Sequence, residues 1–484
     1  MMHNVHPMTP HRAKATLDGS PIRALLDRRL PSKFDYCIFR RWDQLEQALN
    51  GSGDIDLLIG KEDANRFASA ANSLGGKRAE MLRWHDNAVP GREDWLFHDL
   101  ERNALVHLDV HNSINAGPRF AKLCPALTLD DLTAYRTINS PAGQVSVADP
   151  TDLIKISAVR SAFSGASGNG TPAVTRIGPS VGHEHEHEVE ICGTVIRTSD
   201  DGKNLYAKSD HLRQLANAVC DGRRTLWLRH FARMGIYGVI RAGHRLGLRH
   251  WPKRRMKAGG LVVALVGPDG MGKSTQVEIL TDLFGRKLST ASIYMGSSGL
   301  LSRIALSLRS QSAQQSKVDG QRKHSKTEKA KPKDHVEDFA RSVWGLYLAL
   351  LRLWRTHHAR LMARRGLVVI CDRWPQSSER GILDGPVRRK TASSWPVTEW
   401  IFQQEERVYR MLDKRRPDVL FHLVANYEIA ETRKPGELSQ SNFDSRVALM
   451  EKERERFPDI VVIDAAQSLE ANSRAIAAQV WARL

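Results

Sequence analysis

Residues 261–280, LVVALVGPDGMGKSTQVEIL, combine types and spacings that suit the binding of a polyphosphate. The stretch 267–274 fits the pattern GxxxxGK[ST], whose glycines let successive backbone N–H groups turn inward around phosphate oxygens. Lys273 can reach the β- and γ-phosphates, and the Ser274 hydroxyl can complete a magnesium shell. We therefore expect nucleotide contacts from Gly267, Pro268, Asp269, Gly270, Met271, Gly272, Lys273, Ser274 and Thr275.

Such a loop works only between a strand and a helix, and the flanking residues predict both. Residues 261–266 are an unbroken aliphatic run, typical of a strand buried on both faces. Residues 274–284 have a helical period, and the positive end of that helix would add to the attraction for phosphate. Because strand, loop and helix follow in the required order, we expect ATP and Mg²⁺ as cofactors.

A second apolar run, 366–371, ends in Asp372 and Arg373. A carboxylate at the carboxyl end of a strand beside a phosphate loop can bind magnesium or orient an attacking group. An arginine next to it can form two hydrogen bonds with a transferring phosphate. Further apolar runs at 417–425 and 459–465 precede a helical pattern at 469–484, which predicts an α/β domain over 259–484.

Residues 261–484 resemble the thymidylate kinase family of nucleoside monophosphate kinases, apart from an insert at 311–334. The resemblance rests on the stretches GPDGMGKST, DRW, RPDVLFHLVANYEIAETR and VIDAAQSLEANSRAI. It implies a P-loop NTPase fold, in which a parallel sheet lies between helices in three α/β/α layers. It also implies ATP on the loop and a nucleoside monophosphate facing it.

The same resemblance implies roles for single residues. Lys273 and Ser274 would hold ATP and Mg²⁺, and Asp269 would face the sugar hydroxyl of the acceptor. Asp372 and Arg373 would address Mg²⁺ and the acceptor phosphate. Because glycine rather than arginine follows Asp269, the catalytic arginine must come from the lid after the third strand. The lid candidates are Arg433, which we place in the catalytic set, Lys434 and Arg446.

The acceptor is the least determined part of this resemblance. The segment 375–390, PQSSERGILDGPVRRK, differs from the family's Ser-Ser-x-Ala-Tyr-Gln-like stretch, which shapes the pyrimidine pocket. The insert 311–334 has almost no large apolar residue, so we expect it to be mobile. We expect transfer of the ATP γ-phosphate to a nucleoside monophosphate such as dTMP, with a sugar or polysaccharide-linked acceptor as the alternative.

The N-terminal part contains a separate set of carboxylates. In GSGDIDLLIG, Asp54 and Asp56 are two residues apart on a predicted strand and therefore share a face. Asp109 lies on a second apolar run, ALVHLDVHN. Hard cations favour carboxylate oxygens, and three of them can hold two metals for nucleotidyl transfer.

Residues 34–162 resemble the polymerase-β-type nucleotidyltransferase superfamily through these stretches and VSVADPTDLIKISAVRSAF. The resemblance implies an α+β domain over 1–165 with the three carboxylates as metal ligands. Arg40 and Arg41 stand where the superfamily has a Gly-Ser turn that grips the triphosphate. Either arginine replaces that turn, or the site no longer binds a triphosphate, so nucleotidyl transfer is a second candidate activity.

Two segments separate these domains. Residues 166–210 are rich in Gly, Ser and Pro and predict a flexible linker, in which HEHEHE at 183–188 either binds a transition metal or is solvated. Residues 211–258 predict a basic helical connector, which either binds an anionic membrane or nucleic acid or bridges the two domains. Its candidate anchors are Trp227, Phe231, Tyr237 and Trp251.

Composition adds expectations about partners and compartment. A net charge of +18 favours polyanions, so a polyanion- or membrane-binding module with ATP as a switch is a further alternative. The 484 residues contain no apolar run long enough to span a membrane and no signal sequence. Five scattered cysteines predict neither a disulfide framework nor a zinc site and favour a cytoplasmic protein. A homodimer is among the expected assemblies.

Overall fold

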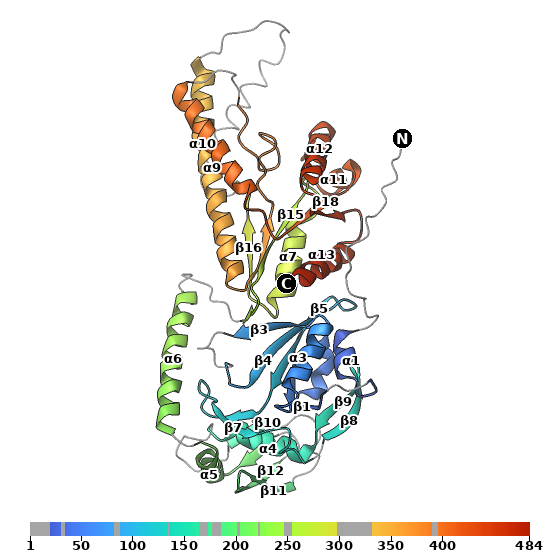
Figure 1. Ribbon diagram of the computed structural model, residues 1–484, viewed down its shortest axis with the longest axis vertical. Coiled ribbons are helices and arrows are strands. Elements are labelled where there is room, and N and C mark those ends of the chain that lie inside the picture. Colours follow the sequence, from blue (N-terminus) through green and yellow to red (C-terminus); the bar gives the residue numbers. More distant parts are fainter. Residues whose placement is uncertain are drawn as a thin grey trace. The chain divides into compact units, whose positions relative to one another are not determined.

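The computed structural model in Figure 1 describes eleven segments of the chain and places them in two compact units, Met1–Trp251 and Pro252–Leu484. The predicted insert at 311–334 lies outside the described residues except for its last three. The described residues are 20–30, 34–81, 88–133, 135–163, 173–176, 185–200, 204–220, 223–245, 254–297, 332–389 and 395–484.

The first unit is built on a mixed sheet with strand order β3-β4-β5-β2-β1-β9-β8. Strand β2 pairs in parallel with β5, and β1 pairs in parallel with β9, whereas the other neighbours are antiparallel. The strands are β1 (Tyr36–Arg40), β2 (Asp54–Ile59), β3 (Lys77–Met81), β4 (Arg92–Asp99), β5 (Ala104–His111), β8 (Tyr135–Ser140) and β9 (Gly143–Ala148). The accompanying helices are α1 (Pro21–Leu26), η1 (Trp42–Gln44), α2 (Leu45–Leu49), α3 (Ala64–Ser73) and α4 (Pro150–Ser161).

The alternation of side chains along β2 and β5 places the acidic residues of both strands on the same face of the sheet. Ile55 and Leu57 of β2 are buried in the same core cluster as Leu108, Phe67 and Trp95. Their neighbours on the strand point the opposite way, because successive side chains of a strand alternate between faces. The acidic residues of both strands therefore lie together on the other face.

The range 166–210 contains a second sheet, which corrects the prediction of a flexible linker for its described part. Strands β10 (Ala173–Arg176), β11 (His185–Ile191), β12 (Thr194–Asp200) and β13 (Asn204–Ala207) are antiparallel in the order β10-β13-β12-β11. Val189 and Ile196 are buried among apolar residues of the unit, which stabilises strands that are otherwise polar. Residues 185–188 of the HEHEHE stretch form the first part of β11, where Glu188 pairs with Arg197 at 3.3 Å.

A disulfide joins Cys124 and Cys220, which corrects the prediction that the cysteines form none. Cys124 begins β7 (Cys124–Leu127), which pairs with β6 (Ile114–Ala116), and Cys220 directly follows α5 (Ser209–Val219). The two cysteines are 96 residues apart, so only the packing of α5 against β7 brings them together. Helix α6 (Arg223–Arg245) follows α5 and occupies much of the predicted basic connector.

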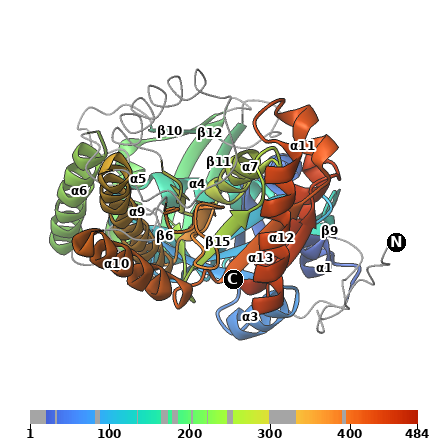
Figure 2. The same cartoon turned by 90° about the horizontal axis from the view of Figure 1, so that it is seen from above.

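The second unit contains an entirely parallel sheet with strand order β16-β17-β15-β18-β19. Helices α9 and α10 run side by side in both views (Figures 1 and 2). The strands are β14 (Arg254–Met256), outside this sheet, β15 (Leu261–Val266), β16 (Thr290–Tyr294), β17 (Val368–Asp372), β18 (Val419–Val424) and β19 (Val461–Asp464). The helices are α7 (Lys273–Gly285), α9 (Pro332–Arg364), α10 (Pro396–Asp413), α11 (Tyr427–Arg433), α12 (Gln440–Arg456) and α13 (Leu469–Arg483).

This sheet confirms the α/β class and the strand and helix predicted around the phosphate loop. Strand β15 lies between β17 and β18, and Leu265 is in register with both Asp372 and Phe421. The carboxyl ends of these three parallel strands therefore meet at one edge, where ligands bind in open α/β sheets. No helix in the described parts of the chain is both long and apolar enough to span a membrane.

Candidate functional site

The loop between β15 and α7 has the backbone geometry that the glycines predicted. Gly270 and Gly272 have φ angles of 88° and 80°, in the left-handed region where other residues are strained. A Cβ atom at Gly270 would lie 2.8 Å from the carbonyl oxygen of Ala430, so no larger residue fits there. Helix α7 begins at Lys273, and its first N–H groups face the loop interior.

Lys273 is folded back onto this loop. Its side chain is buried, and its Nζ donates a hydrogen bond of 2.7 Å to the carbonyl oxygen of Pro268. The same atom lies 3.6 Å from Oδ1 of Asp269. Burial lowers the pKa of Lys273 to about 8, although the nearby Asp269 acts in the opposite direction. At neutral pH most of the Lys273 side chains are therefore still protonated, and Nζ lies inside the loop, where an entering anion could bind it.

Ser274 and Asp372 form a pair that fits a magnesium ion. The Ser274 hydroxyl donates a hydrogen bond of 2.7 Å to Oδ2 of Asp372, the last residue of β17. Oδ1 of Asp372 is buried and has no hydrogen-bond partner among the described residues. A buried carboxylate oxygen without a donor, beside a hydroxyl, matches the oxygen ligands that Mg²⁺ prefers.

Asp269 is the centre of a cluster of cationic side chains. Arg373 donates to its Oδ1 at 2.7 Å, and Arg446 donates to its Oδ2 at 2.6 Å. Burial acts to raise the pKa of Asp269, but Lys273, Arg373 and Arg446 together lower it to about 2. The carboxylate therefore stays ionised at neutral pH and holds two guanidinium groups beside the phosphate loop.

Asp384 and Arg352, which no sequence pattern singled out, extend this cluster. Arg373, which has a φ angle of 72°, also lies 3.4 Å from Asp384, and Asp384 accepts a hydrogen bond of 2.8 Å from Arg352. Arg352 is buried on α9 and donates to the carbonyl oxygen of Met295 at 3.2 Å. In the sequence, Arg352 interrupts the apolar run LALLRLW. A charged residue within such a run was the only local indication that Arg352 has a special role.

The structure does not bring Arg433 into this cluster, so its expected role as the catalytic lid arginine stays a prediction. Arg433 ends α11 and donates a hydrogen bond of 3.0 Å to the carbonyl oxygen of Ala465, after β19. Lys434 pairs with Glu437 at 3.1 Å. The position facing Asp269 belongs to Arg446, because α12 returns over the loop and carries Arg446 on the side that faces it.

A cavity of about 70 Å³ lies next to the phosphate loop. Its walls are mostly apolar, and Gly267 and Arg373 border it. Burial lowers the pKa of His422, which also lines it, to about 4, so the imidazole is neutral at neutral pH. The remaining walls include Trp374, Leu383, Leu420, Leu449, Met450 and Phe457.

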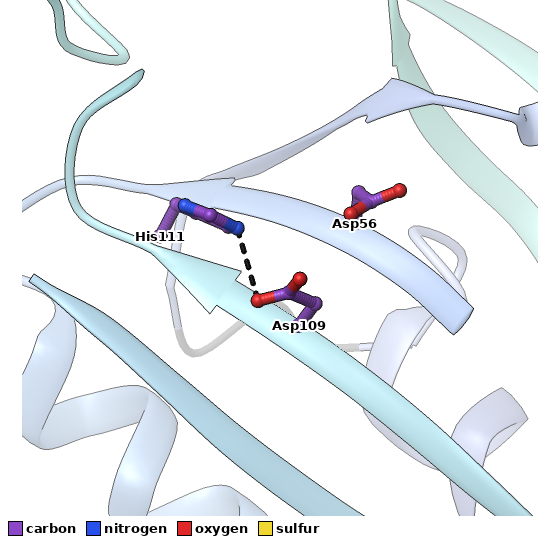
Figure 3. Close-up of side chains that lie close together, drawn as sticks. All are labelled: Asp56, Asp109 and His111. Atoms are coloured by element: carbon purple, nitrogen blue, oxygen red, sulfur yellow. Dashed lines mark ion pairs between the residues drawn. The ribbon is translucent and has the colours of Figure 1, made fainter. Parts of the chain in front are cut away.

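The first unit brings together Asp56, Asp109 and His111, with ligand atoms that all lie within 4.8 Å of one another (Figure 3). His111 was not predicted, although it follows Asp109 by two residues on β5 and so shares its face. Asp54 lies outside this group of three. Its Oδ1 is 2.8 Å from Nδ1 of His107.

Arginines already compensate the carboxylates of this group. Arg40 donates to both oxygens of Asp56, at 2.8 and 2.9 Å. Arg92 donates to Asp109, which also lies 2.9 Å from Nε2 of His111. A magnesium ion needs these oxygens and would meet two guanidinium groups, so the residues as they stand do not fit it. Arg40 thus binds a predicted metal ligand, which favours the second of the two alternatives for this position, a site that no longer binds a triphosphate.

Comparison with known proteins relates the chain to two proteins of Escherichia coli, while no protein-family model matches it. It is 30% identical over 179 residues to the uncharacterized ATP-binding protein YghS of strain K12, covering 36% of this chain and 73% of that protein. It is 26% identical over 204 residues to the uncharacterized ATP-binding protein YghR of the same strain, covering 40% and 75%. The chain belongs to the family of the uncharacterized ATP-binding protein YghS.

Proposed function

We propose that the second unit is a Mg²⁺-dependent phosphotransferase that resembles thymidylate kinase and moves the γ-phosphate of ATP to a phosphorylated acceptor. The observation that carries this proposal is the convergence of Lys273, the Ser274–Asp372 pair and the Asp269 cluster at the carboxyl ends of β15 and β17. The description of both E. coli relatives as ATP-binding proteins supports ATP as the nucleotide.

Each group of the site has a role in this reaction. Lys273 would exchange the Pro268 carbonyl for the β- and γ-phosphate oxygens, since a phosphate is the stronger acceptor for an ammonium group. Ser274 and Asp372 would hold Mg²⁺, which neutralises charge on the phosphates when bound. Arg373 and Arg446 would donate to the transferred phosphoryl group, where negative charge spreads over the equatorial oxygens.

The acceptor that we favour is a nucleoside monophosphate, with dTMP as the reference compound. Asp269 holds Arg373 and Arg446 beside the loop, where they can receive an acceptor phosphate. The apolar cavity bordered by Arg373 could receive a flat, weakly polar group, such as a base. A sugar or polysaccharide-linked acceptor stays the alternative, because Asp384, Asp413, Arg416 and Glu453 also line the cavity and could bind hydroxyl groups.

The test is a measurement of ATP turnover by the purified full-length chain with nucleoside monophosphates, sugars and sugar phosphates. We expect turnover with a nucleoside monophosphate that Lys273→Met abolishes. Lys414→Met removes an equal charge at an exposed position of the same unit and serves as the matched control. Binding of MgATP without turnover of any acceptor would refute phosphotransfer and favour ATP as a switch. No binding of MgATP would refute the whole proposal.

Nucleotidyl transfer by the first unit is the second candidate, because Asp56, Asp109 and His111 do converge. The guanidinium groups of Arg40 and Arg92 weigh against it, since they occupy the carboxylate oxygens that metals would use. This candidate predicts incorporation of a nucleoside triphosphate that Asp109→Asn abolishes and Lys273→Met leaves unchanged. The two variants therefore separate the two activities.

A further inference from the structure

One face of helix α6 is anchored to the first unit through Phe120. The backbone N–H of Phe120 donates to Nδ1 of His230 at 3.3 Å, and Arg233 donates to the carbonyl oxygen of Phe120 at 3.0 Å. The ring of Tyr237 lies 5.4 Å from the ring of Phe120. Leu226, His230, Arg233 and Tyr237 recur at intervals of three and four residues, so they mark one side of the helix. Tyr237 is therefore a packing residue rather than the outward anchor that the sequence suggested.

The opposite face of α6 is apolar and exposed. Leu228, Phe231 and Val239 are 69%, 56% and 74% exposed. At about 100° per residue, Leu228 and Val239 lie within about 20° of one another and nearly opposite Tyr237. Ala232 and Gly235, which lie between them on this face, are small, and Arg224 lies on the same side at the start of the helix. Leu228, Phe231 and Val239 therefore project from a face on which the residues between them have small side chains.

The charge of α6 is of one sign. The helix RRTLWLRHFARMGIYGVIRAGHR contains arginine at positions 223, 224, 229, 233, 241 and 245 and neither aspartate nor glutamate. Arg229 is exposed at the edge of the apolar face, about 80° from Val239, whereas Arg241 is exposed nearer to the anchored side, about 40° from Tyr237. Long arginine side chains can place their guanidinium groups at lipid phosphates while their stems cover apolar surface. A helix with this division binds in the plane of a membrane interface.

We propose that the outer face of α6 seats the protein on a membrane surface that contains anionic lipids. Leu228, Phe231 and Val239 enter the boundary between headgroups and acyl chains, and the flanking arginines bind headgroup phosphates. The apolar centre of the face favours a bilayer over nucleic acid, whose backbone offers no apolar layer to receive it. The absence of acidic residues from α6 favours an anionic surface over a neutral one. This surface is separate from the proposed phosphotransfer site.

The test uses full-length protein and sedimentation with vesicles of phosphatidylcholine, either alone or with a third of phosphatidylglycerol. We expect binding at least about tenfold stronger to the anionic vesicles, because each arginine near such a surface contributes about fivefold. Raising the salt concentration should weaken it severalfold. The double variant Leu228→Ser/Val239→Ser should lose at least about tenfold, since it removes two side chains from the apolar layer.

Two controls separate this surface from general adhesion. Val195→Ser truncates an exposed valine of β12 in the same unit and should leave binding unchanged. Arg229→Gln should weaken binding to anionic vesicles alone, and circular dichroism should show that all variants are folded. Equal binding by the Leu228→Ser/Val239→Ser variant overturns the proposal, as does a failure of the native chain to bind anionic vesicles. Binding to a duplex oligonucleotide that depends only on the arginines would assign the surface to nucleic acid and likewise overturn it.

Discussion

The lowered pKa of Lys273 predicts that the affinity for MgATP falls as the pH rises through about 8. In the free protein the ammonium group is buried and loses its proton near this pH. A bound polyphosphate places negative charge beside Nζ, which favours the protonated form and raises the pKa of Lys273 in the complex. Since the ligand binds the protonated form better, affinity is full below the pKa of the free protein and is lost above it.

The magnitude follows from the protonated fraction of Lys273. With a pKa of about 8, that fraction falls from roughly three quarters at pH 7.5 to about 3% at pH 9.5. The dissociation constant should therefore rise about 25-fold across this range, equivalent to about 1.9 kcal/mol. Secondary phosphate groups titrate near pH 6 and stay ionised throughout, so the ligand contributes little to the change.

Isothermal titration calorimetry in two buffers of different ionisation enthalpy measures both the affinity and the protons taken up. We expect uptake to rise from about one quarter of a proton at pH 7.5 to nearly one at pH 9.5. Lys273→Arg keeps a positive charge that does not titrate in this range and should bind with little pH dependence. A pH-independent affinity of the native chain, or the same pH dependence in Lys273→Arg, would refute the assignment of Lys273 as the phosphate ligand.

Three further predictions concern catalysis and stability. Arg446→Gln should lower kcat/KM by about 100-fold or more, because it removes a donor beside the transferred phosphate. Arg433→Gln should lower kcat/KM by less than about tenfold, and equal losses in steady-state kinetics would contradict the geometry. Gly270→Ala should destabilise the chain by about 1–3 kcal/mol in urea unfolding, since the residue has a positive φ and its Cβ would lie 2.8 Å from a carbonyl oxygen of α11; an unchanged midpoint would contradict this. Reduction of the disulfide between Cys124 and Cys220 should lower the free energy of unfolding by about 2–5 kcal/mol, because the disulfide closes a loop of 96 residues. The variant with alanine at both positions should have the same lowered free energy of unfolding, and reductant should not change it.

The sequence predicted the strand and the helix on either side of the candidate phosphate loop because everything that defines them is contiguous. Strand β15, the three glycines, Lys273 and α7 follow one another within 25 residues, and each obeys a local rule. Asp372 was also found, since an apolar run that ends in a carboxylate marks the edge of a parallel sheet. Local rules therefore sufficed for this half of the site.

The rest of the site depends on contacts between distant segments, which no local pattern contains. The choice between Arg433 and Arg446 required the direction in which α12 returns over the loop. Asp384 acquires its importance only through Arg352 and Arg373, which come from other elements.

The same limit applied in the first unit. The sequence did not predict the strands within 173–207, because their few buried apolar residues stand among charged and small ones. The disulfide was hidden by the 96 residues between its cysteines.

The contacts of the phosphate loop with α11 and α12 have a consequence for the order of events at the site. Gly270 lies close to Ala430 of α11, Arg446 of α12 is paired with Asp269, and the two helices contact one another. If α11 and α12 moved away from the phosphate loop as a pair, both contacts would separate together. If the proposed phosphotransfer holds, a phosphorylated ligand that competes with Asp269 for Arg446 would break the contact of α12 with the loop, so we expect binding of that ligand to loosen both helices together.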